Sequence, residues 1–136
     1  MADTLKLMVP GKPEYVRTVR LAVSSLANKI GFDIEAIEDI KVAVSEACSN
    51  IVCHSDIDSD RLYQVACNIC DDRIEILIED EGVGFDMDMY EEPSPDQIKE
   101  GGLGVFIIRA LMDEVNVRSE VGSGTRIKMV KYVTAE

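Results

Sequence analysis

The chain has 136 residues, of which 46% are apolar and 29% are charged, and its net charge at pH 7 is −12. This length and apolar content are typical of one globular domain with its own core, so we expect residues 1–136 to form a single domain. The negative charge argues against a nucleic acid partner, because phosphate contacts need clustered Lys and Arg. No apolar run reaches the roughly 18 residues of a membrane span and no export signal is visible, so we expect a cytoplasmic protein without a membrane partner.

The first half of the sequence predicts a short strand followed by two helices. Residues 5–9 read as a strand that a Pro-Gly pair ends. Apolar residues at helical spacing then predict a helix over about residues 13–30, with Gly31 as its C-cap. Asp33 is a good N-cap for a second helix, which is followed by the polar loop 55–60.

The second predicted helix has two faces that both look suited to burial. Glu46 and Asn50 are four residues apart, so they stack on one face, on roughly the same side as Asp39 and the small Ala43. A solvated face would more typically be filled with Lys and Glu. The other face is apolar and consists of Ile37, Ile40, Val44, Ala47, Cys48 and Ile51.

The second half of the sequence predicts a sheet that a further helix interrupts. Alternating apolar residues predict two strands, 62–69 and 73–80, joined by a tight turn. Residues 81–102 show no periodicity, and a loop of this length is usually functional. A helix over 103–115 and a closing hairpin over 115–133 follow. This order predicts an α+β fold, namely a two-layer sandwich in which helices cover one face of a mixed, mostly antiparallel sheet.

The four cysteines are interpreted as buried apolar groups. Cys67 and Cys70 form a C-x-x-C pattern, but in a strand an offset of three residues sends the two sulfurs to opposite faces. Cys48 and Cys53 would lie about 140° apart around a helix. We therefore expect neither a zinc site nor a disulfide.

Glu46 and Asn50 together have the chemistry of a phosphoryl-transfer site. An amide oxygen beside a phosphate chain can ligate Mg²⁺, and a carboxylate one turn away can accept a proton from an attacking hydroxyl. The alternative is that Glu46 is solvated and that Asn50 caps the backbone locally.

Two glycine-containing segments add to this pattern. In residues 80–86, DEGVGFD, Asp80 ends an apolar strand and can accept hydrogen bonds from an exocyclic amine, while Gly82 and Gly84 let the backbone approach a planar ring. In residues 100–106, EGGLGVF, free N–H groups at the start of a helix can bind an anion. The alternatives are a simple acidic turn and a plain helix start.

These motifs, in the order E-x-x-x-N, D-x-G-x-G, G-x-G before a helix and G-[ST]-G-T in a hairpin, resemble the GHKL ATPase family over about residues 5–133. The stretches PEYVRTVRLAVSSLANKIGF, EDIKVAVSEACSN and EGGLGVFIIRALMDEV are similar to its short members that are bacterial anti-sigma factors and serine-protein kinases, above all the anti-sigma-B factor. The resemblance implies a homodimer that binds ATP or ADP with Mg²⁺ and phosphorylates a serine of an anti-anti-sigma antagonist protein. It also implies that the protein sequesters an alternative sigma factor and so represses transcription in a stress response.

The resemblance implies roles for individual residues as well. Glu46 would be the catalytic base and Asn50 the Mg²⁺ ligand, and Asp80 would bind the adenine amino group in a pocket shaped by Gly82 and Gly84. The phosphates would be held by Gly102, Leu103, Gly104 and Val105, the adenine end would be supported by Thr125, and the ATP lid would be residues 87–101.

The sequence departs from the family pattern at two places. The aromatic residue that often follows the position of His54 is absent, which leaves the role of this histidine open. The lid is short and acidic, with Lys99 as its one cation, so Arg109 is a candidate to neutralise the γ-phosphate. Weak or slow turnover would be consistent with such a lid.

Arg17, Arg20 and Leu21 lie off the apolar stripe of the first predicted helix and form a candidate surface for a protein partner, with a solvated basic face as the alternative. Two other functions are possible. A histidine-kinase-type catalytic domain normally needs a preceding helix pair with a phosphoacceptor His, and the twelve residues before the first expected helix contain no His. A nucleotide-dependent binding module without kinase activity would not need Glu46 and Asn50 together.

Overall fold

The computed structural model describes residues 2–54, 61–80, 102–120 and 124–134. Its elements are β1 (Asp3–Pro10), a short 3-10 turn (Pro13–Tyr15), α1 (Val16–Ile30), α2 (Ile34–His54), β2 (Leu62–Ile69), β3 (Arg73–Asp80), α3 (Gly102–Leu111), β4 (Glu114–Glu120) and β5 (Gly124–Tyr132). None of the helices in the described part of the chain is long and apolar enough to cross a membrane.

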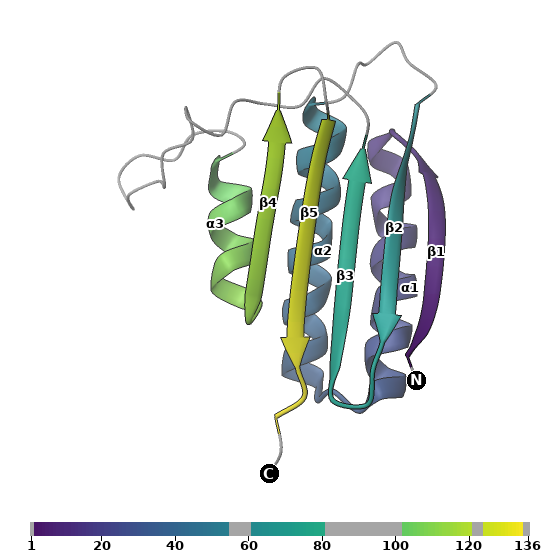
Figure 1. Cartoon of the computed structure of the whole chain (residues 1–136), viewed down its shortest axis with the longest axis vertical. Coiled ribbons are helices and arrows are strands. Elements are labelled where there is room, and N and C mark those ends of the chain that lie inside the picture. Colours follow the sequence, from purple (N-terminus) through teal and green to yellow (C-terminus); the bar gives the residue numbers. More distant parts are fainter. Residues whose placement is uncertain (1, 55–60, 81–101, 121–123, 135–136) are drawn as a thin grey trace.

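The five described strands form one sheet in the order β1-β2-β3-β5-β4, with β5 between β3 and β4. Figure 1 shows the three helices on one face of this sheet, while no described helix covers the other face. The predicted two-layer α+β fold is confirmed. Each described strand pair is antiparallel, so the sheet is not mixed.

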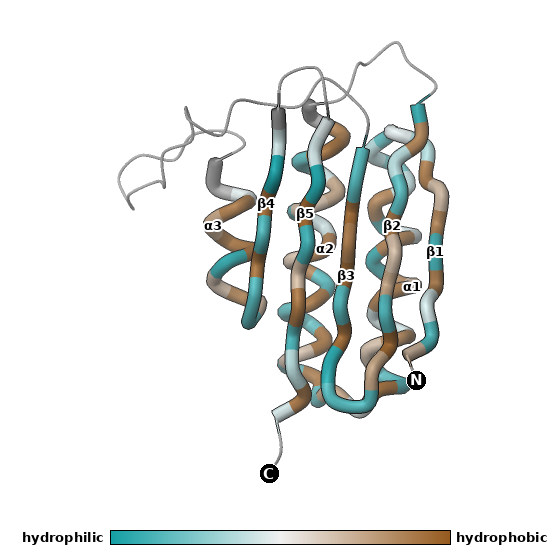
Figure 2. Tube along the Cα trace, in the orientation of Figure 1, coloured by the Kyte–Doolittle hydropathy of each residue, from teal (hydrophilic) through white to brown (hydrophobic). Residues whose placement is uncertain are grey.

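The core lies between the sheet and the helices, because every second residue of the strands faces the helix layer. Figure 2 shows the alternation of apolar and polar residues along the strands. In β3 the side chains of Ile74, Ile76 and Ile78 are fully buried, as the sequence alternation predicts. From the helices, the fully buried apolar side chains are Val19, Val23, Ala27, Ile40, Ala43, Val44, Ala47, Cys48, Ile51, Val105 and Ile108.

The junction between α1 and α2 has the caps that the sequence predicts. Gly31 has a φ of 108°, a left-handed conformation that favours glycine, and its N–H donates to the carbonyl of Ala27. The Asp33 carboxylate accepts a hydrogen bond of 2.8 Å from the N–H of Ala36. These caps end one helix and start the next, so that α2 packs beside α1 and runs the length of the sheet.

Three elements differ from the sequence prediction by more than one residue at an end. The helix predicted from about residue 13 begins as α1 at Val16, after the 3-10 turn Pro13–Tyr15. β1 spans Asp3–Pro10 and is longer than the predicted strand 5–9. The helix predicted over 103–115 ends at Leu111, and Glu114 already starts β4. The reason is that the N–H of Asp113 donates to the carbonyl of Val130 on β5, so the chain turns from the helix into the sheet.

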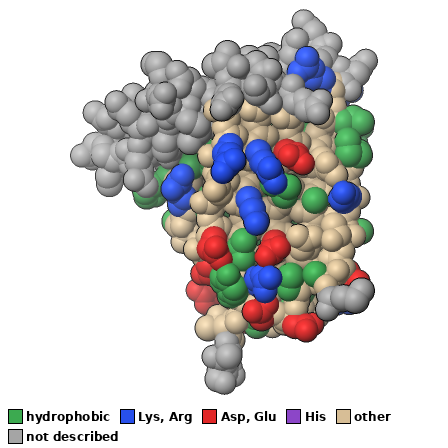
Figure 3. Space-filling model, in the orientation of Figure 1, with side chains coloured by type: hydrophobic (Ala, Val, Ile, Leu, Met, Phe, Trp, Pro, Cys, Tyr) green, Lys and Arg blue, Asp and Glu red, His purple; other side chains and the backbone are tan. Residues whose placement is uncertain are grey.

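The uncovered face of the sheet, called the open face here, has separate zones of positive and negative charge. In Figure 3, Lys and Arg side chains gather mostly in its upper half and acidic side chains mostly in its lower half. In the upper zone, Arg118 of β4 lies directly opposite Arg126 of β5, and Lys128 lies two residues further along β5. Arg126 approaches Glu79 of β3 to 3.9 Å, a long contact between two largely exposed side chains.

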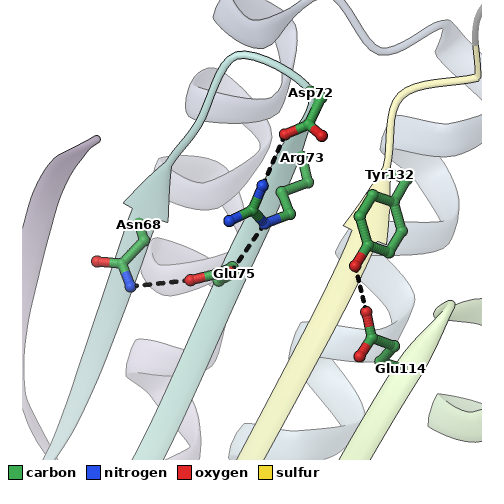
Figure 4. Close-up of polar contacts among 6 residues, drawn as sticks. All are labelled: Asn68, Asp72, Arg73, Glu75, Glu114 and Tyr132. Carbon is green, nitrogen blue, oxygen red and sulfur yellow. Dashed lines mark hydrogen bonds and ion pairs between the residues drawn. The ribbon is translucent and has the colours of Figure 1, made fainter. Parts of the chain in front are cut away.

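The lower zone of the open face contains a network of hydrogen-bonded charges (Figure 4). The guanidinium of Arg73 donates to Glu75 at 2.9 Å and to Asp72 at 2.8 Å. The hydrogen bond from Arg73 lowers the pKa of the Glu75 carboxyl below its ordinary value. Next to this group, the hydroxyl of Tyr132 donates to Glu114 on the neighbouring strand.

Candidate active site

Four segments that are far apart in the sequence meet at the upper end of the sheet in Figure 1. They are the C-terminal half of α2, the end of β3, the start of α3 and the start of β5. As a result, the predicted site residues Glu46, Asn50, Asp80, Gly104 and Thr125 belong to elements that converge on one end of the molecule.

Asn50 is a buried amide on α2, with 6% of its surface exposed. Neither its amide nitrogen nor its amide oxygen has a hydrogen-bond partner among the residues that the structure describes. Ala43, on the same side of the helix, is fully buried, which confirms that this side faces inward. An unsatisfied buried polar group costs about 1–3 kcal/mol, so an amide at this position fits a ligand rather than a packing role. The amide oxygen of Asn50 is a suitable ligand for a hard cation such as Mg²⁺.

Glu46 is half-buried, one helical turn before Asn50, and its carboxylate lies against α3. A Cβ atom built on Gly104 would be 3.2 Å from Oε2 of Glu46. Gly104 is the third residue of α3, and the first N–H groups of a helix have no partner within the helix. The arrangement therefore brings a carboxylate next to a helix start that can bind an anion.

Of the remaining residues predicted to hold the phosphates, Gly102 and Leu103 are the first two residues of α3. The side chain of Val105 is buried, with 1% of its surface exposed. Val105 can therefore contribute to an anion site through its backbone only.

Three buried polar side chains form a row across the end of the sheet. Asp80 of β3 is the register partner of Thr125 on β5, which is the partner of Ser119 on β4. The exposed fractions of these side chains are 8%, 3% and 7% in that order. The hydroxyls of Ser119 and Thr125 are hydrogen-bonded at 2.9 Å. Such a row of polar groups at the end of an apolar core suits a polar heterocycle.

Ser119 is a further residue of the candidate site, and sequence reasoning missed it. The signal that could have revealed it is the alternation in β4, where Val115, Val117 and Ser119 point to the same side of the sheet. A serine at an inward position of a strand is a buried polar group, and such groups need a partner.

A cavity of about 860 Å³ opens at this end of the sheet. Asp80, Ser119, Gly124 and Thr125 line one part of it, and the other part extends over the open face. The lining residues of that second part are Met8, Arg61, Leu62, Gln64, Glu79, Arg118 and Arg126. Glu46 and Asn50 do not line the cavity, because they lie on the helix side of the sheet. The cavity therefore coincides with the predicted adenine end only.

Two core thiols are protonated at neutral pH. Burial raises the pKa of Cys48 to about 12 and that of Cys67 to about 11. Both side chains lie in the core, which confirms that they are buried apolar groups. The same prediction is wrong for Cys70, which is only half-buried, and the side chain of Cys53 lies outside the described residues. Within the described ranges, no group of three or more His, Cys, Asp and Glu side chains could hold a metal ion.

Some predicted residues lie elsewhere or outside the described residues. Gly82, Gly84 and the predicted lid, residues 87–101, lie outside them. His54 is the last residue of α2, and Arg109 is an exposed residue of α3. The candidate partner residues Arg17, Arg20 and Leu21 are on α1, which packs against α2.

Comparisons of the sequence identify its relatives. The model of the histidine kinase-like ATPase domain matches residues 9–131. The serine-protein kinase RsbW of Bacillus subtilis (strain 168) is 40% identical, over 99% of this chain and 89% of its own length. The serine-protein kinase RsbW of Halalkalibacterium halodurans is 41% identical, over 96% of this chain and 84% of its own length.

Solved structures with a similar fold include one with an RsbW domain and one of a histidine kinase domain. The crystal structure of RsbU and RsbW domains from Mycobacterium tuberculosis matches with a TM-score of 0.73 and 23% identity, over 98% of this chain and 33% of that chain. A histidine kinase domain from Erythrobacter litoralis matches with a TM-score of 0.57 and 21% identity, over 90% of this chain and 60% of that chain. At these identities the likeness shows the fold.

The matched domain family is an ATPase family, so membership implies ATP binding. The family match covers most of the chain, and the identity to the kinases extends along nearly all of it. The chain therefore belongs to the histidine kinase-like ATPase domain family and, within it, to the RsbW serine-protein kinases.

Proposed function

We propose that this chain acts in the cytoplasm, as a single domain over residues 1–136, as an ATP-dependent protein-serine kinase and anti-sigma factor. It transfers the γ-phosphoryl group of ATP to a serine of an antagonist protein, and it sequesters an alternative sigma factor. The identity of 40% to a serine-protein kinase along 99% of the chain supports this function over a histidine-kinase-type domain.

The observation that carries the proposal is the buried amide of Asn50. It lacks a partner among the described residues and lies one turn from a half-buried carboxylate. In the proposed site, its oxygen would hold Mg²⁺ together with the phosphates of ATP. The bound ion would supply positive charge that neutralises the phosphate oxygens during transfer.

Glu46 is proposed as the general base. Its carboxylate accepts the proton of the serine hydroxyl while that oxygen forms a bond to the γ-phosphorus and the bond to the β-phosphate breaks. The contact of Glu46 with the start of α3 supports this role, because the phosphates are proposed to bind the first N–H groups of α3, over Gly102, Leu103, Gly104 and Val105.

The adenine end is proposed to lie at Asp80 and Thr125. The Asp80 carboxylate would accept a hydrogen bond from the adenine amino group, and Thr125, supported by Ser119, would contact the ring. Gly82 and Gly84 are proposed to shape this pocket, and residues 87–101 to form the ATP lid.

Replacing Glu46 tests the proposal. In Glu46→Gln, phosphotransfer from Mg-ATP to the antagonist should fall by about 100-fold or more, because a general base contributes this much, while the affinity for Mg-ATP changes little. Labelled ATP measures transfer and calorimetry measures binding.

The matched control is Glu35→Gln, an exposed carboxylate in the first turn of the same helix. Equal transfer by Glu46→Gln would remove Glu46 from the mechanism. Binding without transfer by the unaltered chain would favour the alternative, a nucleotide-dependent binding module.

The exposed side of α1 is proposed as the surface for a protein partner. Leu21 is 53% exposed, and the Nε of Arg20 is shielded from water without a hydrogen-bond partner among the described residues. Arg17 is exposed on the same helix. An apolar side chain next to arginines is typical of interfaces.

Leu21→Asp should weaken capture of the sigma factor by about 10-fold or more, because it places a charge in an apolar contact. Ser25→Asp, an exposed position on the same helix, is the control. If this surface is not used, capture assays will show equal binding of the sigma factor by both variants.

The chain is also proposed to form a homodimer, which sedimentation at micromolar concentration would detect as twice the mass of the single chain.

A further inference from the structure

The third residue of α3, Gly104, has no side chain, although its conformation does not require glycine. Among the described residues, the glycines with positive φ are Gly31 and Gly124. Gly104 lies within a regular helix, where glycine is among the least favourable residues and alanine is the most favourable. Its backbone conformation is therefore one that alanine would adopt readily, and the reason for glycine must be space.

The space next to Gly104 is filled by the carboxylate of Glu46. A Cβ atom on Gly104 would be 3.2 Å from Oε2 of Glu46, which is closer than most real contacts of a Cβ atom. The backbone carbonyl oxygen of Glu46 would be 4.0 Å away, an ordinary contact distance. An added methyl group would therefore press on the carboxylate and not on the backbone of α2.

We propose that Gly104 is a positioning residue for Glu46, because the missing methyl group leaves the volume that the carboxylate occupies. This inference rests on the proposed role of Glu46 as the base. It gives Gly104 a role separate from phosphate binding, which would use the backbone N–H groups of α3. With alanine at position 104, those N–H groups are kept and the carboxylate must shift by a few tenths of an ångström.

The two roles predict different kinetic results. If Gly104 positions Glu46, Gly104→Ala lowers the rate constant of phosphotransfer at saturating ATP by about 10-fold, because small displacements of a reacting group have large effects on rate. The same variant changes the Kd for Mg-ATP by less than about 2-fold. If Gly104 is needed for close approach of the phosphates, the same variant weakens nucleotide binding at least as much as it slows transfer. The melting temperature should stay the same or rise, since alanine favours the helix.

A double-variant cycle with Glu46→Asp tests the contact itself. Aspartate is one methylene shorter, so its carboxylate no longer reaches the position next to residue 104. In the Glu46→Asp background, Gly104→Ala should therefore change the rate constant by less than about 2-fold, although it costs about 10-fold in the unaltered chain. Ala110→Gly, at an exposed position of the same helix, controls for helix stability.

The outcomes separate this inference from the proposed function. If Glu46→Gln abolishes transfer but Gly104→Ala transfers at the normal rate, Glu46 is the base and Gly104 does not position it. If Gly104→Ala mainly weakens nucleotide binding, or slows transfer equally in both backgrounds, the positioning role is excluded as well. If the unaltered chain transfers no phosphate, the proposed function fails before this test applies.

Discussion

Asn50 has the features of a residue that is kept for function at the expense of stability. Its amide is buried and has no partner among the described residues, so we expect it to lower the stability of the nucleotide-free protein. We expect Asn50→Leu, a change of similar size, to raise the free energy of unfolding by about 1 kcal/mol and to abolish Mg²⁺-dependent binding of ATP. Urea denaturation and calorimetry measure the two effects.

The control for this variant is Asn28→Leu, at an exposed position of α1. It should change neither the free energy of unfolding nor nucleotide binding by a measurable amount. A loss of stability in Asn50→Leu would mean that the amide is satisfied in the nucleotide-free protein, which contradicts this account of the site.

At the level of residues, the sequence spacing predicted candidate site residues where a polar side chain interrupts an apolar helical pattern. Glu46 and Asn50 were found because they fall on the side of an otherwise apolar helix that Ala43 also occupies. Ser119 lies outside the glycine-rich motifs, and only its inward position in β4, alternating with Val115 and Val117, distinguishes it. The contact between Gly104 and Glu46 could not be predicted, since it depends on how closely α2 and α3 pack.

At the level of elements, the burial of one thiol on α2 and one on β2 predicts a dependence of stability on alkaline pH. Burial raises the pKa of Cys48 from an ordinary value of 9.0 to about 12, and that of Cys67 to about 11. In the unfolded chain both thiols ionise from about pH 9, whereas in the folded chain they remain neutral. Their contribution to stability is therefore complete below pH 9 and is lost as the pH rises from 9 towards 12.

We expect the free energy of unfolding to fall above pH 9, by up to about 1.4 kcal/mol per pH unit for each thiol. Cys48→Ala should be less stable at pH 7 but have a shallower dependence on pH. Val44→Ala, a buried position on the same helix, should lose stability without a change of slope. Urea denaturation between pH 8 and pH 11 measures these slopes, and equal slopes for all three proteins would contradict the prediction.

Elements with a strong local pattern were predicted with their bounds. The strands 62–69 and 73–80 match β2 and β3, because their alternation is regular and a polar turn separates them. The helix predicted to residue 115 stops at Leu111, since the apolar spacing of its last residues also fits the start of a strand. The pairing of β2 with β3 and that of β4 with β5 are confirmed, because a turn or a hairpin joins each pair. The pairing of β1 with β2 and that of β3 with β5 were not predicted, because they join strands that are far apart in the sequence.

At the level of the whole molecule, the distribution of charge favours the upper end of the sheet for an anionic ligand. The net charge of −12 opposes the approach of a polyanion such as ATP. The basic zone of the open face, with Arg118, Arg126 and Lys128, lies at the same end as the candidate site. This zone reduces the repulsion where the nucleotide is proposed to bind, while the acidic lower half of the open face remains at the opposite end.

The position of β5 in the sheet has a consequence during protein synthesis. This strand is translated after all the other described elements, yet it lies between β3 and β4 and provides Thr125. A nascent chain that still holds these residues inside the ribosome cannot close the sheet, even though both long helices have already emerged. The candidate site is therefore complete only after β5 has left the ribosome and inserted between β3 and β4.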